Sequence, residues 1–216
     1  MKFIGIILLL LTSIFLIACS ANQTSNKISN SELENLASKY GGVYIFNQKF
    51  VEEIEKREVE RKAVNQQILS EIAHISNKSE RNAKMRELLK ERYYNNPKIE
   101  QTLSNGKRYY LKWLDYENET GKKVKIPDEY VNKIKEFIGD ENFSKSPKPL
   151  LRKFYIDNGQ IIPITISLTY SYQSKKYGLF GDEGAGIKFS KSETNYVLGG
   201  NKFYFDSSKN TFVKEK

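Results

Sequence analysis

The chain has 216 residues and a mass of 25.1 kDa, the size of one globular domain with a tail, so a second full domain is not expected. Apolar residues make up 39% of it, and its 14 Tyr and 12 Phe can build a core, which excludes a wholly disordered protein. The formal net charge of +9 is spread along the sequence without a run of five Lys or Arg, so no nucleic-acid partner is expected.

The first predicted element is an apolar segment at the amino terminus. Lys2 supplies a positive charge, and an apolar run over residues 3–17 follows, interrupted only by one Gly, one Thr and one Ser. A membrane-spanning helix needs about 20 predominantly apolar residues, whereas this run gives way at once to polar sequence. Residues 1–18 are therefore interpreted as a signal peptide for export.

The apolar segment closes with Leu16, Ile17, Ala18 and Cys19, and Cys19 is the only cysteine of the chain. These residues resemble the lipobox of bacterial lipoproteins. The resemblance implies that signal peptidase II recognises the first three of them and cuts before Cys19. It also implies a diacylglycerol on the Cys19 sulfur and a further acyl chain, such as palmitate, on the new amino terminus. Two or three acyl chains give a stable lipid anchor. The alternative is that Cys19 is an incidental thiol in an ordinary signal or membrane helix.

The sequence after the cleavage site is polar. Ser20 follows the cysteine, and in the sorting rule of bacterial lipoproteins an Asp there favours retention in the inner membrane, so the resemblance favours the outer membrane. Residues 19–30 contain too few apolar side chains to order themselves by burial, and we interpret them as a lipidated flexible tether.

Residues 31–216 are predicted to form a single domain with a helical part, 31–96, and a mainly β part, 97–216. Helices that come mostly before strands favour an α+β fold with an antiparallel sheet. The segment Val43–Phe46 is either a brief strand or a packed connector. From capping signals and apolar spacing, helices are predicted at about Ser31–Tyr40, Gln48–Ile75 and Ser79–Tyr94, and one inserted helix at Pro127–Ile138.

The β part is defined by Tyr, Ile, Val and Thr between turn residues. A stretch from Ser174 to Ser192 contains four Gly, and we interpret it as a mobile surface loop. The predicted strands are Ile99–Leu103 and Lys107–Tyr116 around an Asn105-Gly106 turn, then Gln160–Gln173, Tyr196–Leu198, Lys202–Asp206 and Thr211–Lys214.

The hairpin around Asp157-Asn158-Gly159 allows two registers. A two-residue loop pairs Asp157 with Gln160, whereas a three-residue loop pairs Ile156 with Gln160 and gathers more apolar side chains on one face. A slip of one residue inverts every side chain, so matching of the faces predicts the three-residue loop. It also predicts a positive φ at Gly159 and burial of the even-numbered residues 162–168.

Catalytic and metal-binding signals are weak in this sequence. His74 is the only histidine, and Ser70 lies one helical turn before it, but we interpret His74 as a solvated residue near a helix end. Asp182 and Glu183 within the Gly-rich segment 178–186 offer two carboxylates, too few for a calcium cage of about six oxygen ligands. No catalytic residue, metal site or cofactor is predicted, and the part that segment 178–186 plays stays open.

The expected function is that of a lipid-anchored bacterial envelope lipoprotein, held on the outer membrane or facing the periplasm. Its domain is expected to be a non-enzymatic binding or interaction module for a macromolecular envelope or surface partner. Two alternatives stay open. The first is an envelope enzyme acting on peptidoglycan or another polymer, and the second is an inhibitor of, or immunity protein against, a secreted enzyme.

Overall fold

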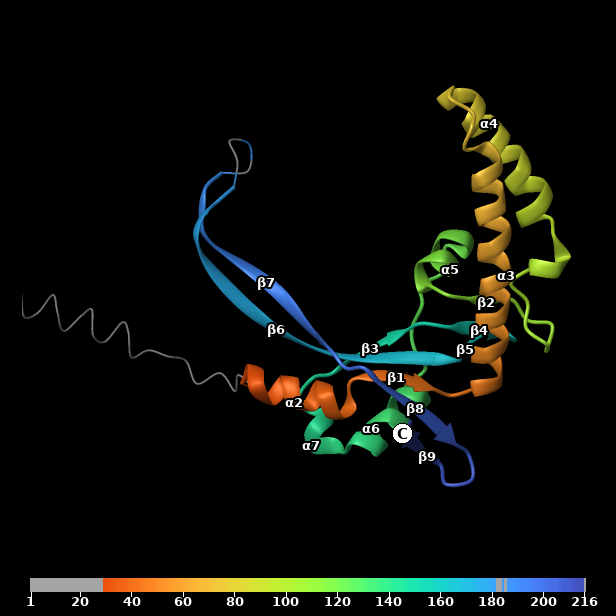
Figure 1. Ribbon diagram of the computed structural model, residues 1–216. Helices are drawn as coiled ribbons and strands as arrows, with labels where there is room; N and C mark the ends of the chain where they lie inside the picture. Colours follow the sequence, from red (N-terminus) through yellow and green to blue (C-terminus); the bar gives the residue numbers. More distant parts are fainter. Residues whose placement is uncertain (1–28, 182–183, 185, 216) are drawn as a thin grey trace, which may run out of the picture. The chain divides into compact units, whose positions relative to one another are not determined.

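The computed structural model describes residues 29–181, 184 and 186–215 (Figure 1). The chain divides into two compact units, Met1–Asn30 and Ser31–Lys216, and the second of them is the folded domain treated below. The domain has the α+β class expected from the sequence. Its helices are α2 (Asn30–Tyr40), α3 (Gln48–Ile72), α4 (Lys78–Leu89), α5 (Trp113–Thr120), α6 (Asp128–Ile138) and α7 (Asp140–Phe143), with a π-helical turn at Lys90–Tyr94 and a 3-10 turn at Pro97–Ile99.

The strands form a mixed main sheet and a small antiparallel sheet. In the main sheet the order is β3-β6-β1-β8-β9, and β7 pairs with the distal part of β6. The central strand β1 is antiparallel to β6 and parallel to β8, a pairing that the predicted antiparallel sheet did not include. The small sheet has the order β2-β4-β5. The strands are β1 (Gly42–Ile45), β2 (Tyr109–Tyr110), β3 (Lys148–Leu151), β4 (Phe154–Asp157), β5 (Gln160–Pro163), β6 (Thr165–Phe180), β7 (Lys188–Leu198), β8 (Asn201–Asp206) and β9 (Thr211–Lys214).

The largest core cluster lies between the main sheet and α6. Tyr44 on β1 is fully buried and stacks on Phe203 of β8, with 4.7 Å between the ring centroids. Ile134 and Ile138 cover these rings from the buried stripe of α6. The Tyr44 hydroxyl donates to the backbone carbonyl of Tyr40 at 2.7 Å, so a polar atom at the centre of the core is satisfied.

Three glycines, Gly41, Gly42 and Gly199, allow two segments of backbone to pass close to each other where β7 leads into β8. A Cβ on Gly199 would collide with the backbone carbonyls of Gly41 and Ala37, and these atoms leave room for no side chain. The Asn201 side chain donates to the carbonyls of Gly41 at 2.7 Å and Ser38 at 2.8 Å. The end of α2 is thereby fastened to the start of β8.

The helices α3 and α4 form a pair in which α4 folds back along the distal half of α3 (Figure 1). Ile68 and Ile72 of α3 and Leu88 of α4 are buried in the seam between them. The predicted helix boundaries agree with these elements to within a few residues, but the cap of α4 is Asn77 rather than Ser79. The Asn77 side chain accepts from the backbone N–H groups of Ser79 and Glu80.

Several β-part predictions are wrong in their details. The Asn105-Gly106 turn forms, but only the Thr102–Arg108 bridge and the two-residue β2 accompany it, and the second half of the predicted strand Lys107–Tyr116 belongs to α5. Three helices, α5, α6 and α7, lie between the strands where one was expected. The predicted loop Ser174–Ser192 is mostly strand, because β6 runs to Phe180 and β7 begins at Lys188.

The register predicted for the β4–β5 hairpin is also wrong. Asp157 pairs with Gln160, so the loop contains only Asn158 and Gly159. Both have positive φ, 48° and 78°, as a type I′ turn requires, and the positive φ expected at Gly159 is confirmed.

Face matching failed there because the ribbon is interrupted beside Ile164, between β5 and β6. Phe154 and Ile166 pack in the same core cluster. In an uninterrupted hairpin with the observed register, their side chains would point to opposite faces of the sheet. Ile164 itself enters a second cluster with Ile54 of α3. Burial of Ile164, Ile166 and Leu168 is confirmed, whereas Ile162 is only half-buried.

Candidate functional site

The residues on which the predicted lipid attachment depends are not among those that the structure describes. Leu16, Ile17, Ala18 and Cys19 lie outside the described residues, as does nearly all of the tether 19–30.

His74 and Ser70 do not form a catalytic pair. His74 lies in the turn after α3, where it is exposed, as expected from the sequence. The Ser70 hydroxyl donates to the backbone carbonyl of Gln66 at 3.0 Å, which is ordinary for a serine on a helix surface.

The candidate site is a two-stranded extension of the main sheet, which we call the arm and define as Ser171–Phe180 of β6 with Lys188–Tyr196 of β7. Before the arm begins, β6 is flanked by other strands, with Lys148 of β3 as the last partner on one side and Gly42 of β1 on the other. From Ser171 onward β7 is the only strand of the described residues that pairs with β6 (Figure 1). Both edges of this ribbon are open, and an open strand edge is a ready contact for another molecule.

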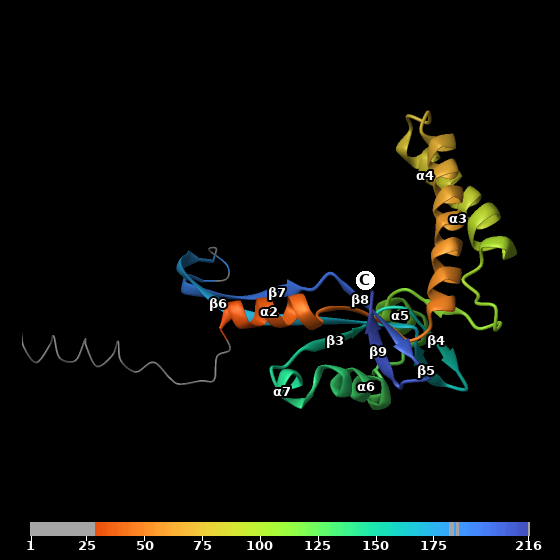
Figure 2. The ribbon, with the colours of Figure 1, turned by 60° about the horizontal axis from the view of Figure 1, so that its bottom comes forward.

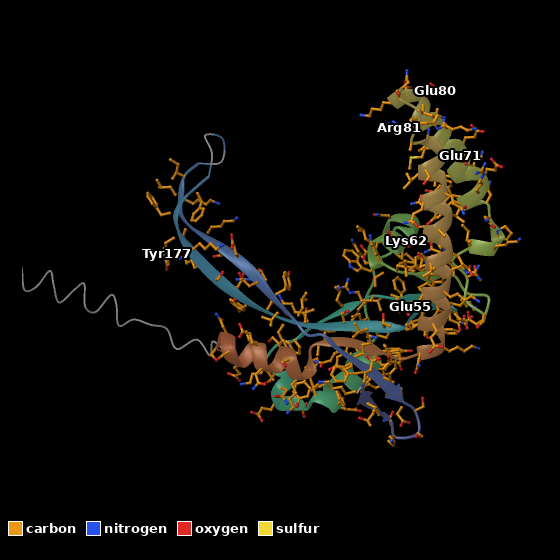
Figure 3. All side chains as sticks on the ribbon, in the orientation of Figure 1. Glu55, Lys62, Glu71, Glu80, Arg81 and Tyr177 are labelled. Carbon is orange, nitrogen blue, oxygen red and sulfur yellow. The ribbon has the colours of Figure 1, made fainter. Side chains whose placement is uncertain are left out.

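Large apolar side chains at the end of the arm are exposed to solvent. The exposed fractions are 79% for Tyr177, 73% for Leu179, 70% for Ile187 and 77% for Phe189. Tyr177, labelled in Figure 3, pairs with Ser190, so Phe189 lies on the opposite face of the ribbon from Tyr177. Apolar side chains therefore emerge from both faces of the arm, which is unusual for a solvated hairpin.

Charged side chains lie directly behind the apolar end. Lys176 and Lys191 face each other across the two strands, and Glu193 bridges them, with 2.7 Å to the Lys176 Nζ and 3.4 Å to the Lys191 Nζ. The hydrogen bond from Lys176 holds the pKa of Glu193 below its usual range. On the other face the ammonium of Lys175 lies 5.6 Å from the centroid of the Tyr177 ring, within reach of a cation–π contact.

At the root of the arm, Tyr170 is fully buried, and its hydroxyl has no hydrogen-bond partner among the described residues. Burial raises the pKa of Tyr170 to about 12. The arm is therefore attached to the core at Tyr170, although no described residue forms a packed layer above or below its end.

A second feature is a groove of about 1030 Å³ between α3 and the segment after the π-helical turn, lined among others by Glu53, Arg57 and Ile99. Beside it, Glu58 accepts from the Tyr109 hydroxyl at 2.6 Å and lies 3.3 Å from the Arg61 Nε. Burial, followed by the Glu58 contact, raises the pKa of Tyr109. Because Tyr109 on β2 donates to Glu58 on α3, we assign this contact to attachment of α3 to the small sheet, although the Arg61 Nε has no hydrogen-bond partner among the described residues.

Sequence reasoning missed the arm because four Gly within Ser174–Ser192 were taken as loop signals. Gly178 falls in a β-bulge between Tyr177 and Phe180, and β6 continues to Phe180 while β7 begins at Lys188. The signal that could have revealed the arm is the set of strand-forming residues on each side of the turn, among them Tyr177, Phe189 and Tyr196.

Neither the described residues nor the comparisons identify a function. Within 29–181, 184 and 186–215, no cluster of His, Cys, Asp and Glu could hold a metal ion, and no helix is long and apolar enough to cross a bilayer. Comparison with known proteins gave no match, since neither a family model, nor a curated protein, nor a solved structure is similar to this chain.

Proposed function

We propose that this chain is a lipid-anchored protein of the bacterial cell envelope whose domain acts there as a non-enzymatic binding module. The observation that carries the proposal is the position of the sole cysteine, Cys19, directly after Leu16-Ile17-Ala18 at the end of an apolar export segment. A thiol with no possible disulfide partner in its own chain is available for lipid attachment.

The binding role is supported by the arm. An apolar patch that a folded domain leaves in water costs free energy, and domains that keep such a patch generally use it as a contact surface. The partner in this proposal is a component of the envelope, and the outer membrane is the location.

The anchor is tested by Cys19→Ser in the full chain, with Ser20→Ala as the matched control at the next position. Without the thiol no thioether can form, so the variant accumulates as an uncleaved precursor, whereas the control is cut and lipidated. The mass of the amino-terminal peptide and partition into a detergent phase measure both steps. Cleavage of Cys19→Ser at the same bond, with recovery in the detergent phase, contradicts the proposal.

A further inference from the structure

We infer that the end of the arm binds the phospholipid bilayer itself, at the level of the headgroups, and holds the domain against the membrane surface. The inference rests on the proposed function, since it takes the membrane that carries the Cys19 lipid as the partner of the arm. Three features of the described residues lead to it.

The first feature is that apolar side chains leave the arm on both faces. A second protein or a second copy of this chain that stacked on one face would cover Phe189 or Tyr177, and the other ring would remain in water. A bilayer interface surrounds whatever enters it and covers both faces together. Tyr and Phe are suited to that depth, since Tyr keeps a polar tip beside its apolar ring.

The second feature is the position of the lysines. Lys175, Lys176 and Lys191 follow directly behind the exposed apolar side chains along the two strands. Lysine extends its ammonium toward phosphates while its alkyl stem covers apolar surface.

The sequence places two carboxylates, Asp182 and Glu183, in the turn of the arm, outside the described residues. Carboxylates are costly in hydrocarbon, so the proposed depth is shallow, about 5–10 Å into the boundary between headgroups and acyl chains, where water remains. The proposal rests on the exposed apolar side chains of the strands and on the position of the lysines behind them. It does not depend on a net positive charge of the arm.

The third feature is where the anchored chain enters the domain. The helix α2 begins at Asn30, and from the glycine crossing it extends to the same side as the arm in both views of the domain (Figures 1 and 2). The eleven chain steps from Cys19 to Asn30 span at most about 40 Å. A lipid on Cys19 therefore leaves α2 within reach of the bilayer, and α2 lies on the side of the domain from which the arm emerges.

The test places a single tryptophan on the arm of the full, lipidated chain. Trp113, the only tryptophan, is replaced by Phe, and Phe189→Trp is introduced; a second chain carries Tyr94→Trp in the same background. Tyr94, at the end of the π-helical turn, is 71% exposed and serves as the matched control. Both chains are reconstituted into vesicles of phosphatidylcholine and phosphatidylglycerol, with and without bromine on the upper acyl carbons.

At interfacial depth the arm tryptophan loses more than about half of its emission to brominated lipid and is shielded from acrylamide in the water, while the control shows neither effect. Adding Leu179→Asn and Ile187→Asn to the Phe189→Trp chain reduces the quenching by brominated lipid. An arm tryptophan that acrylamide quenches as strongly as the control overturns the inference. Shielding from acrylamide without quenching by brominated lipid also overturns it, because the arm is then covered by protein.

The same preparation separates this inference from the proposed anchor. The mass of the amino-terminal peptide reports the lipid on Cys19, whatever the arm does. If the chain is lipidated but its arm tryptophan stays in water, the proposed anchor is supported and only the membrane role of the arm is contradicted. A chain without lipid on Cys19 removes the anchor and, with it, the basis of the inference.

Discussion

The domain has two extensions that are each built from a pair of antiparallel elements, the helices α3 and α4 and the strands of the arm. The helices bury the apolar seam formed by Ile68, Ile72 and Leu88, and turn charged side chains outward (Figure 3). Contacts such as the Arg92–Glu71 ion pair, at 2.7 Å, lie on the solvated side. The two helices thus bury a common apolar seam, while Val59 and Leu69 of α3 stay exposed.

The arm differs because its strands pair with each other through backbone and polar contacts but do not bury the large apolar side chains at its end. The interstrand hydrogen bonds are made along its length, but Tyr177 and Phe189 have no layer to pack against. A two-stranded ribbon by itself is marginally stable in water and gains from a third surface. The comparison shows that the helix pair has a buried apolar seam of its own, whereas the large apolar side chains at the end of the arm lie in solvent.

The largest expected effect comes from opening the glycine crossing at which β7, one strand of the arm, leads into β8. In Gly199→Ala the new methyl group collides with the Gly41 carbonyl, so the crossing has to open, and we expect the free energy of unfolding to fall by more than about 4 kcal/mol. Gly200→Ala is the matched control, because no atom lies within 4 Å of its new methyl group. Urea unfolding measures both. Equal losses in the two variants would show that the crossing does not support the arm.

The next effect contrasts the two extensions directly. Ile68 is fully buried in the helix pair, so Ile68→Ala should lower the free energy of unfolding by about 2–5 kcal/mol. Phe189→Ala on the arm removes a larger side chain but should change the same quantity by less than about 0.5 kcal/mol, since that ring is exposed. Thermal and urea unfolding without vesicles give the comparison. A loss above 2 kcal/mol for Phe189→Ala would mean that the arm already has a packed partner within the domain.

The sequence predicted the helix pair better than the arm for a physical reason. A helix shows its buried face by local spacing, and the predicted helix from Gln48 was confirmed as α3. Strand pairing depends on residues far apart in the chain, and β1 was left open between strand and connector because four residues carry little pattern. Its partners, β6 and β8, lie more than 100 residues later.

The candidate site was the least predictable part. Gly178 and its neighbours favoured a loop, because glycine is usually a turn signal and nothing local distinguishes a bulge in a long hairpin from a surface loop. The opposite error occurred at Asn158-Gly159. There the prediction relied on matching the apolar faces of the strands, although an Asn-Gly pair is typical of a two-residue turn. The turn chemistry decided the register there, because the interruption beside Ile164 removed the constraint on the faces.

The smallest effect concerns the charges that support the arm. Lys176 donates to Glu193 and holds the pKa of that carboxyl below its usual range. A carboxyl whose pKa is lower in the folded chain contributes stability that is fully present above its unfolded pKa and is lost as the pH falls through the folded value. Acidification across that window should therefore loosen the pairing of the arm strands before the core opens.

A carboxyl-carbon NMR titration of Glu193 measures this effect, with amide exchange in the arm as a second readout. Lys176→Gln replaces the charged ammonium donor by a neutral amide and should move the Glu193 pKa back toward the ordinary value of about 4.3. Lys191, 3.4 Å away, remains, so the return should be incomplete. Lys175→Gln is the matched control, because Lys175 pairs with Ser192 and its side chain lies on the opposite face from Glu193. An equal shift in the two variants would mean that the general field of the lysines, and not the Lys176 contact, governs this carboxyl.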